Sequence, residues 1–233
     1  MHYYNGILCT KSPQQYDIQL MQKQWQDIQS KLSTDQWVCY NGLHHETAVQ
    51  YSEHCTNKYV DSCIGVDSTG FERVRFKDVK KIHNNKIKDE TAIRTIVPEY
   101  QGTVFEQILK DFNGCRGRIM GLSSGRCYNA HKDGTSPYGR YGIALETNYC
   151  CGFWYPNYGK IYYIPADGHV YWVNINSTHS VINASDNLKL RYHFTFTSTN
   201  NVEQWPEAST EPPKDIQILD DDKHTSDEIY TQG

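Results

Sequence analysis

The chain has 233 residues, which is enough to bury one hydrophobic core. Its formal net charge of -4 indicates neither a nucleic-acid partner nor a lipid surface, and no apolar run approaches the length of a bilayer. The N-terminus lacks the basic start and apolar core of a signal peptide, so we expect a cytoplasmic protein. The eight cysteines show no CxxC spacing and are expected to be mostly free thiols.

Residues 1–115 are expected to form a helical and mixed region that packs on the rest of the protein. Residues 14–32 are rich in good helix formers and carry an apolar stripe at helical spacing, which predicts an amphipathic helix. A second helix is predicted over residues 103–112 for the same reason. Between the two helices the pattern indicates only short strands, at 37–40 and 72–76.

From residue 116 the pattern changes to short strands separated by turn residues. Strand-like runs occur at 118–122, 142–147, 160–165, 169–174 and 188–197. Such a series is typical of a β-sandwich or a small barrel. Residues 166–168, Ala-Asp-Gly, are expected to form the tight turn of an antiparallel hairpin between two of these strands.

The last strand-like run alternates apolar and polar residues, so its two faces differ. One interpretation is an edge strand with a solvated polar face. The other is that Arg191 and His193 point into a polar cavity inside a small barrel, where ligands bind.

Residues 201–233 are rich in Asp, Glu, Pro and Thr and are expected to form a disordered acidic tail. Truncation from about Pro206 is therefore expected to leave folding intact. Because the tail is acidic, the rest of the chain has a small positive excess. This excess suits a dianionic ligand, although solvated surface lysines explain it equally well.

A candidate metal site begins at His131-Lys132-Asp133, directly after a strand-like run. In extended chain, residues two apart lie on the same side, so His131 and Asp133 can bind one face of a divalent metal. A third ligand from a distant strand would complete a facial triad with open positions, which suits non-haem Fe(II). His179 is the expected third ligand.

Taken alone, an HxD pair is more often a surface accident than a metal site. Two arginines strengthen the metal hypothesis, since a guanidinium binds a carboxylate bidentately. Arg140 lies nine residues after His131, and Arg191 lies twelve residues after His179.

Together these residues resemble the aspartyl/asparaginyl β-hydroxylase family of Fe(II)/2-oxoglutarate-dependent oxygenases. The resemblance covers about residues 116–197 and rests on the HxD motif, on RYGIALETN at 140–148, on THSVIN at 178–183 and on Arg191. It implies a mainly β protein with flanking helices, in which residues 116–200 form a double-stranded β-helix, the jelly-roll fold of cupins. In one departure, Gly142 stands where the family often has histidine.

The resemblance also implies the chemistry. Iron would be held by His131, Asp133 and His179, and 2-oxoglutarate by Arg140 and Arg191, with Arg191 on the distal carboxylate. The reaction would be hydroxylation of an amino-acid or peptide side chain with release of succinate and CO2, and no general base would be needed beyond the metal ligands.

Other polar and aromatic residues of the β-region have open roles. Four residues either make contacts that support the metal ligands or are simply buried core residues: His193, Asn174, Asn183 and Trp172. A second set either lines a substrate pocket or belongs to the core: Tyr128, Trp154, Tyr163 and Trp172.

Two alternative functions fit the same residues. The fold could hold another divalent ion, such as zinc, and hydrolyse or isomerise a substrate without oxygen, although paired arginines argue against this. The protein could instead be a non-catalytic, cupin-like binding module whose acidic tail recruits a partner. The adjacent pair His44-His45 is a poor second metal site, because neighbouring residues of a strand face opposite ways.

Overall fold

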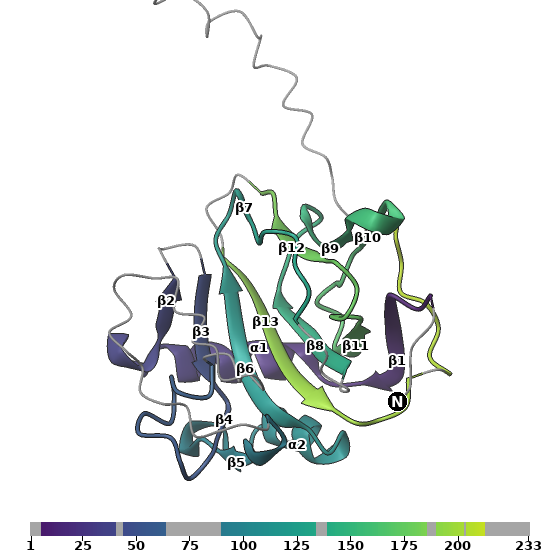
Figure 1. The fold of residues 1–233 in the computed structure, drawn as a ribbon. Coiled ribbons are helices and arrows are strands. Elements are labelled where there is room, and N and C mark those ends of the chain that lie inside the picture. Colours follow the sequence, from purple (N-terminus) through teal and green to yellow (C-terminus); the bar gives the residue numbers. More distant parts are fainter. Residues whose placement is uncertain are drawn as a thin grey trace, which may run out of the picture.

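A computed structural model describes residues 6–40, 44–63, 90–133, 139–185, 190–202 and 204–212, with residues 39 and 40 described by their backbone only. Within these ranges the protein is mainly β, with two α-helices and antiparallel sheets consistent with a β-sandwich (Figure 1). The strand predicted at 72–76 lies outside the described residues.

The larger sheet has seven strands in the order β1-β11-β8-β13-β6-β3-β2, and each adjacent pair is antiparallel. These strands are β1 (Cys9–Gln15), β11 (His169–Val173), β8 (Gly139–Glu146), β13 (Arg191–Ser198), β6 (Cys115–Leu122), β3 (His44–Ala48) and β2 (Val38–Tyr40). Three strands from the N-terminal half thus belong to the same sheet as the strands of the C-terminal half.

The smaller sheet has four strands in the order β10-β9-β12-β7. They are β10 (Lys160–Tyr162), β9 (Cys151–Tyr155), β12 (Ser180–Asn183) and β7 (Arg126–Cys127). A separate two-stranded sheet pairs β4 (Gln50–Tyr51) with β5 (Thr95–Ile96). Short 3-10 helices are η1 (Thr34–Gln36), η2 (Glu90–Ala92), η3 (Pro98–Tyr100) and η4 (Pro156–Tyr158).

Both predicted helices are confirmed, as α1 (Ile18–Gln29) and α2 (Val104–Asp111). Helix α1 begins where the Asp17 side chain accepts a hydrogen bond from the backbone N–H of Leu20, at 3.0 Å. Its apolar stripe is buried, and α1 passes behind the seven-stranded sheet (Figure 1). Helix α2 buries four apolar residues in the same core.

Strand β13 shows how the core is divided. Its residues Tyr192, Phe194 and Phe196 pack toward the helices; the Phe194 ring, for example, lies 5.2 Å from that of Phe105 in α2. The alternate residues Arg191 and His193 instead approach Phe153 of the four-stranded sheet. All eight residues of β13 are buried between β8 and β6, so the edge-strand interpretation is wrong and the polar face lies between the sheets.

The hairpin predicted around residues 166–168 is also wrong. Strand β10 pairs with β9 in the smaller sheet, whereas β11 pairs with β1 and β8 in the larger one. The connection therefore crosses between sheets. It passes through Gly168, which has φ of 77° and whose carbonyl accepts a hydrogen bond from the backbone N–H of Tyr16 at 2.9 Å. Strand alternation gives the period of each strand but not its partners, so the two arrangements look alike in sequence.

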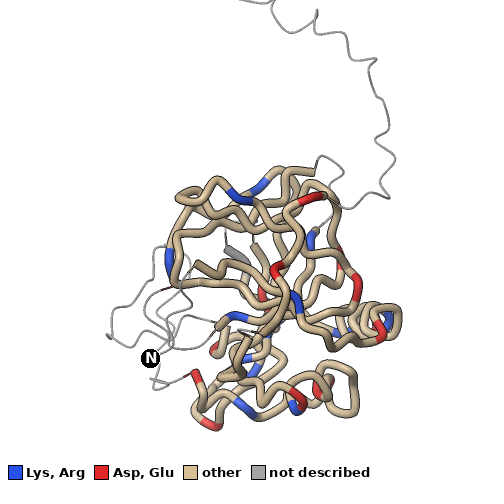
Figure 2. Tube along the Cα trace, turned by 90° about the vertical axis from the view of Figure 1, so that its right-hand side faces the viewer, with Lys and Arg blue, Asp and Glu red and all other residues tan. Residues whose placement is uncertain are grey.

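Acidic and basic residues are interspersed along the described chain (Figure 2). None of the helices in the described ranges is both long enough and apolar enough to span a membrane. The seven cysteines with described side chains are all free thiols, as expected.

Candidate metal centre

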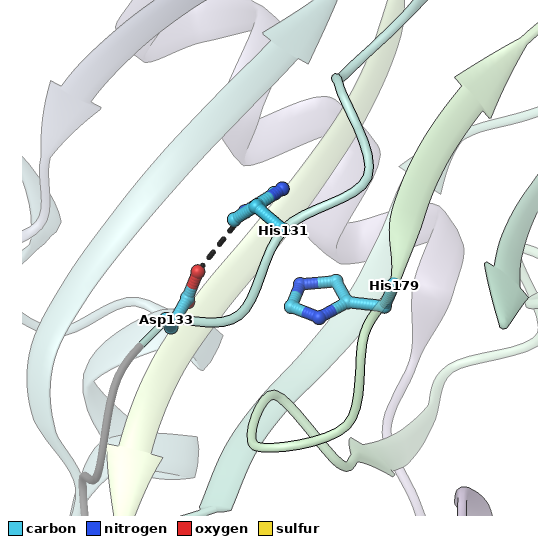
Figure 3. Close-up of side chains that lie close together, drawn as sticks. All are labelled: His131, Asp133 and His179. Carbon is cyan, nitrogen blue, oxygen red and sulfur yellow. Dashed lines mark ion pairs between the residues drawn. The ribbon is translucent and has the colours of Figure 1, made fainter. Parts of the chain in front are cut away.

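The structure brings His131, Asp133 and His179 together from two distant parts of the chain. Their ligand atoms all lie within 4.8 Å of one another, and the two imidazole rings have centroids 4.6 Å apart. Figure 3 shows the three side chains converging. This His-Asp-His group could hold a metal ion.

The backbone fixes the positions of these three residues. His131 and His179 form an antiparallel bridge in which each backbone N–H donates to the carbonyl of the other, both at 2.9 Å. The backbone N–H of Asp133 donates to the carbonyl of Ile175 at 3.0 Å. The segment after β7 is thereby joined to the segment that leads into β12, so the site does not depend on side-chain contacts alone.

Hydrogen bonds to carbonyls also orient both imidazoles. Nδ1 of His131 lies 2.7 Å from the carbonyl of Asn129, and Nδ1 of His179 lies 3.0 Å from that of Ser177. A carbonyl only accepts, so each Nδ1 carries the proton and each Nε2 offers its lone pair. Histidine ligands of metals are typically oriented in this way.

Asn174 supports the His179 side of this arrangement. Its Oδ1 accepts hydrogen bonds from the backbone N–H groups of Asn176 and Ser177, at 3.1 and 3.2 Å. The Ser177 carbonyl in turn holds the His179 ring. Asn174 thus shapes the loop that presents one of the three side chains.

The electrostatics of the group favour a cation. Nε2 of His131 lies 3.0 Å from Oδ1 of Asp133 (Figure 3, dashed line), yet Nδ1 of that ring already carries a proton. The contact is therefore favourable only if the imidazole takes a second proton or a cation lies between the two groups.

The ionisation states suit a metal as well. Burial acts to raise the pKa of Asp133, but the close contact with the His131 ring and the positive charge of Arg140 outweigh it and hold that pKa well below its usual range. Burial is the main cause that lowers the pKa of His179. A carboxylate and neutral imidazoles are the forms that bind a divalent metal.

Arg140, on β8, lies beside the metal group and is bound to several acceptors. Its Nη1 donates to Oγ1 of Thr197 at 2.6 Å and lies 3.6 Å from Oε2 of Glu90. Its Nη2 lies 3.8 Å from Oδ2 of Asp133. Its predicted role as a contact of the cosubstrate stays a prediction.

Arg191 has a different environment at the opposite end of the same sheet face. Its Nη2 donates to Nδ1 of His193 at 3.3 Å, and its guanidinium lies 5.3 Å from the centroid of the Phe153 ring. The Nε atom is buried without a hydrogen-bond partner, and burial lowers the pKa of Arg191 to about 10.

The other buried arginines have carboxylate partners. The ion pairs are Arg116 with Glu90 at 3.0 Å, Arg118 with Glu46 at 3.4 Å, and Arg140 with Glu90 and Asp133. Arg191 forms no such pair with a residue that the structure describes. It is therefore a buried positive charge available to an anionic ligand.

Strand β9 contributes one side chain that packs against Arg191 and another that packs against the metal group. Tyr155 and Phe153 are alternate residues of this strand and both are buried, so they face the interior about 7 Å apart. The Tyr155 ring lies 6.2 Å from the His179 ring, and the Phe153 ring packs against Arg191. Arg191 and the metal group thus both lie on the interior side of β9.

The remaining predicted residues fall in several places. Nε2 of His193 is buried without a partner, and Asn183 is fully buried, donating from Nδ2 to the Leu122 carbonyl at 2.9 Å. Trp172 packs in the core on the helix side of the large sheet. Tyr128 lies near the metal group, with its ring 6.2 Å from that of His131.

Trp154 pairs with Ser180, the neighbour of His179, but its side chain lies on the exposed face of β9. Trp154 is 39% exposed, and Tyr163 lines a cavity of about 200 Å³ together with Thr147, Cys151 and Ala166, among others.

Sequence reasoning missed a cluster of buried charges beside the site: His44, Glu46, Glu90, Arg116 and Arg118. The only sequence signal was the pair of arginines two residues apart in a glycine-rich apolar strand, which places both on one face. Nothing local indicated which carboxylates they would meet.

The chain is thus a mainly β protein with antiparallel sheets and a His-Asp-His group that could hold a metal ion. No protein-family model matches its sequence, and no curated protein matches it either. A function for this protein is therefore inferred from the site itself.

Proposed function

We propose that this protein is an Fe(II)- and 2-oxoglutarate-dependent oxygenase of the aspartyl/asparaginyl β-hydroxylase type, which hydroxylates an amino-acid or peptide side chain. The observation that carries the proposal is the convergence of His131, Asp133 and His179 with their ligand atoms within 4.8 Å. Two imidazoles and one carboxylate with open positions are the ligand set typical of non-haem Fe(II) oxygenases.

The strand order supports a double-stranded β-helix as the catalytic core. The eight consecutive strands from β6 to β13 divide into two antiparallel sets of four, with the orders β11-β8-β13-β6 and β10-β9-β12-β7. A jelly roll distributes eight strands over two sheets in this interleaved manner. We propose that residues 116–200 form this core and that residues 1–115 extend and cover its larger sheet.

Arg191 supports 2-oxoglutarate as the cosubstrate. A guanidinium that is buried without a carboxylate partner among the described residues costs free energy unless a ligand supplies the anion. The distal carboxylate of 2-oxoglutarate would supply it, with the keto-acid end directed to the metal group. His193 would hold the guanidinium in place through its Nδ1.

The protein's contribution to the reaction is binding, orientation and exclusion of water. When bound, iron with 2-oxoglutarate and dioxygen supplies the oxidising power: one oxygen atom enters the hydroxylated product and the other enters succinate as CO2 leaves. His131, Asp133 and His179 would hold the metal. Phe153, which packs against Arg191, and Tyr155, which packs against His179, are buried aromatic residues that would exclude water from a bound cosubstrate.

The test is an anaerobic titration of the metal-free protein, first with Fe(II) and then with 2-oxoglutarate. We expect the visible charge-transfer band that keto-acid chelation to ferrous iron produces. His131→Ala and His179→Ala should lose metal binding and the band while remaining folded. His54→Ala is the matched control, because this histidine side chain is 52% exposed and lies outside the site.

Each other outcome has a definite meaning. Metal binding without the band would favour a non-oxidative metalloenzyme, for instance one that uses zinc. No metal binding at all would favour a cupin-like binding module. A normal band in either active-site variant would contradict the ligand assignment.

A further inference from the structure

Glu90 is the centre of a buried charge cluster next to the metal group. It lies in η2, is 8% exposed, and its Oε2 faces three donors. Nη1 of Arg116 lies at 3.0 Å, Oγ1 of Thr197 at 3.3 Å and Nη1 of Arg140 at 3.6 Å. The carboxylate therefore offsets two buried guanidinium charges at once.

Thr197 joins Glu90 to Arg140. Its hydroxyl accepts a hydrogen bond from Arg140 Nη1 at 2.6 Å and can donate its own proton to Glu90 Oε2 at 3.3 Å. The chain of contacts then continues from Arg140 Nη2 to Oδ2 of Asp133, at 3.8 Å. The other oxygen of Asp133 faces His131.

Arg116 fixes Glu90 from the other side at a cost in backbone energy. Arg116 has φ of 53°, in the left-handed region, where a residue with a side chain is strained. In this conformation its backbone N–H donates to the Ile93 carbonyl at 2.8 Å and its Nε to the Ser62 carbonyl at 3.3 Å. Such strain persists where the surrounding structure requires the geometry. Here the contacts of Arg116 hold the segment that carries Glu90.

We propose that Glu90 is a positioning residue of the metal centre, which binds Arg140 and thereby leaves the Asp133 carboxylate available to the metal. This inference rests on the proposed metal site. Without the negative charge of Glu90, Arg140 would have Asp133 as its nearest carboxylate among the described residues. A closer, bidentate Arg140–Asp133 pair would draw the carboxylate away from the two histidines.

The proposal predicts an effect on metal affinity that a general loss of stability would not produce. Glu90→Gln keeps the size of the side chain but removes its charge. We expect Co²⁺, used as an air-stable stand-in for Fe(II), to bind about 10- to 100-fold more weakly, the usual effect of losing a residue that supports a metal ligand. The measurement is a Co²⁺ titration followed by calorimetry and by the visible bands of the bound ion.

Glu46→Gln is the matched control. Glu46 is also buried, and its ion pairs are with Arg118 at 3.4 Å and His44 at 2.6 Å. Among the described residues, the ion pairs of Asp133 are instead with His131 and Arg140. Its replacement should lower the melting temperature comparably and leave Co²⁺ affinity within about 3-fold of wild type. Equal losses of affinity in both variants, or no loss in Glu90→Gln, would overturn the proposal.

Two further results complete the test. If Glu90→Gln does not fold, Thr197→Val is the variant that tests the proposal, because it removes the hydroxyl that bridges Glu90 and Arg140 without changing any charge. A several-fold weaker Co²⁺ affinity then supports the role of Glu90, and an unchanged affinity overturns it. If the wild-type protein itself binds no metal, the proposed function fails first, and this inference fails with it.

Discussion

At the scale of single residues, buried charges are informative because each one costs free energy unless something offsets it. Arg116, Arg118 and Arg140 are offset by carboxylates of the protein itself. Arg191 is not offset by a carboxylate from any residue that the structure describes, although it is only 5% exposed. We propose that this difference separates arginines that stabilise the fold from an arginine that binds a ligand.

Arg191→Met tests this distinction, because stability and binding should change in opposite directions. Removing a buried charge without a carboxylate partner should stabilise the metal-free protein by about 0.5–2 kcal/mol in urea unfolding. Binding of 2-oxoglutarate to the iron-loaded protein should weaken by about 2–5 kcal/mol, which is roughly 30- to 5000-fold. Iron affinity should change little.

A comparable loss of iron and 2-oxoglutarate binding would instead give Arg191 a structural role. Arg118→Met provides the contrast, because it leaves Glu46 without its guanidinium partner and should destabilise the fold.

At the scale of elements, the connection from β10 to β11 decides how the two sheets are joined. Gly168 makes this crossing possible for two reasons. It adopts φ of 77°, and a Cβ at this position would lie 2.0 Å from the backbone oxygen of Tyr16. The close approach of two backbone segments excludes any side chain there.

Gly168→Ala should therefore destabilise the protein by more than about 3 kcal/mol in urea unfolding, since both strain and overlap contribute. Gly125→Ala is the control. Gly125 also has a positive φ, of 67°, but an added Cβ would meet no atom within 4 Å. It should cost only the backbone strain, about 1–2 kcal/mol. Similar costs for the two variants would mean that the contact with Tyr16 does not matter.

At the scale of the whole molecule, residues 204–212 connect the two sheets. The Pro206 carbonyl accepts from the backbone N–H of Lys11, and the backbone N–H of Ala208 donates to the Cys9 carbonyl; Lys11 and Cys9 both belong to β1. The Ser209 carbonyl accepts from the backbone N–H of Tyr163, just after β10. The truncation point expected from composition, about Pro206, would remove all of these contacts.

We expect a chain ending at residue 212 to unfold at the same temperature as the full chain. A chain ending at residue 205 should lose three backbone hydrogen bonds at about 0.5–1.5 kcal/mol each, and a melting temperature lower by on the order of 5–10 °C. Differential scanning calorimetry distinguishes the two. An unchanged melting temperature for the shorter chain would show that residues 206–212 add no stability.

Several features of the fold could be predicted from the sequence because they depend on neighbours in the chain. Both α-helices follow from the spacing of apolar residues, and β2, β6, β8, β10, β11 and β13 follow from strand-like runs bounded by turn residues. The sequence does not predict β1, β3, β4, β5, β7, β9 and β12. Strand β1, for instance, reads CTKSPQQ, which has few residues with a β preference, and it forms because β11 provides a partner.

The candidate ligand set could be predicted from the sequence, because the HxD spacing and a later histidine are visible without coordinates. The same is true of which residues of β13 share a face. Three features could be established from the folded structure alone: that β13 is a central strand, that β10 and β11 belong to different sheets, and that Glu90 meets Arg116 and Arg140. The physical reason is the range of the interactions: periodicity is set by adjacent residues, whereas strand partners and the offsetting of buried charges depend on residues far apart in the chain.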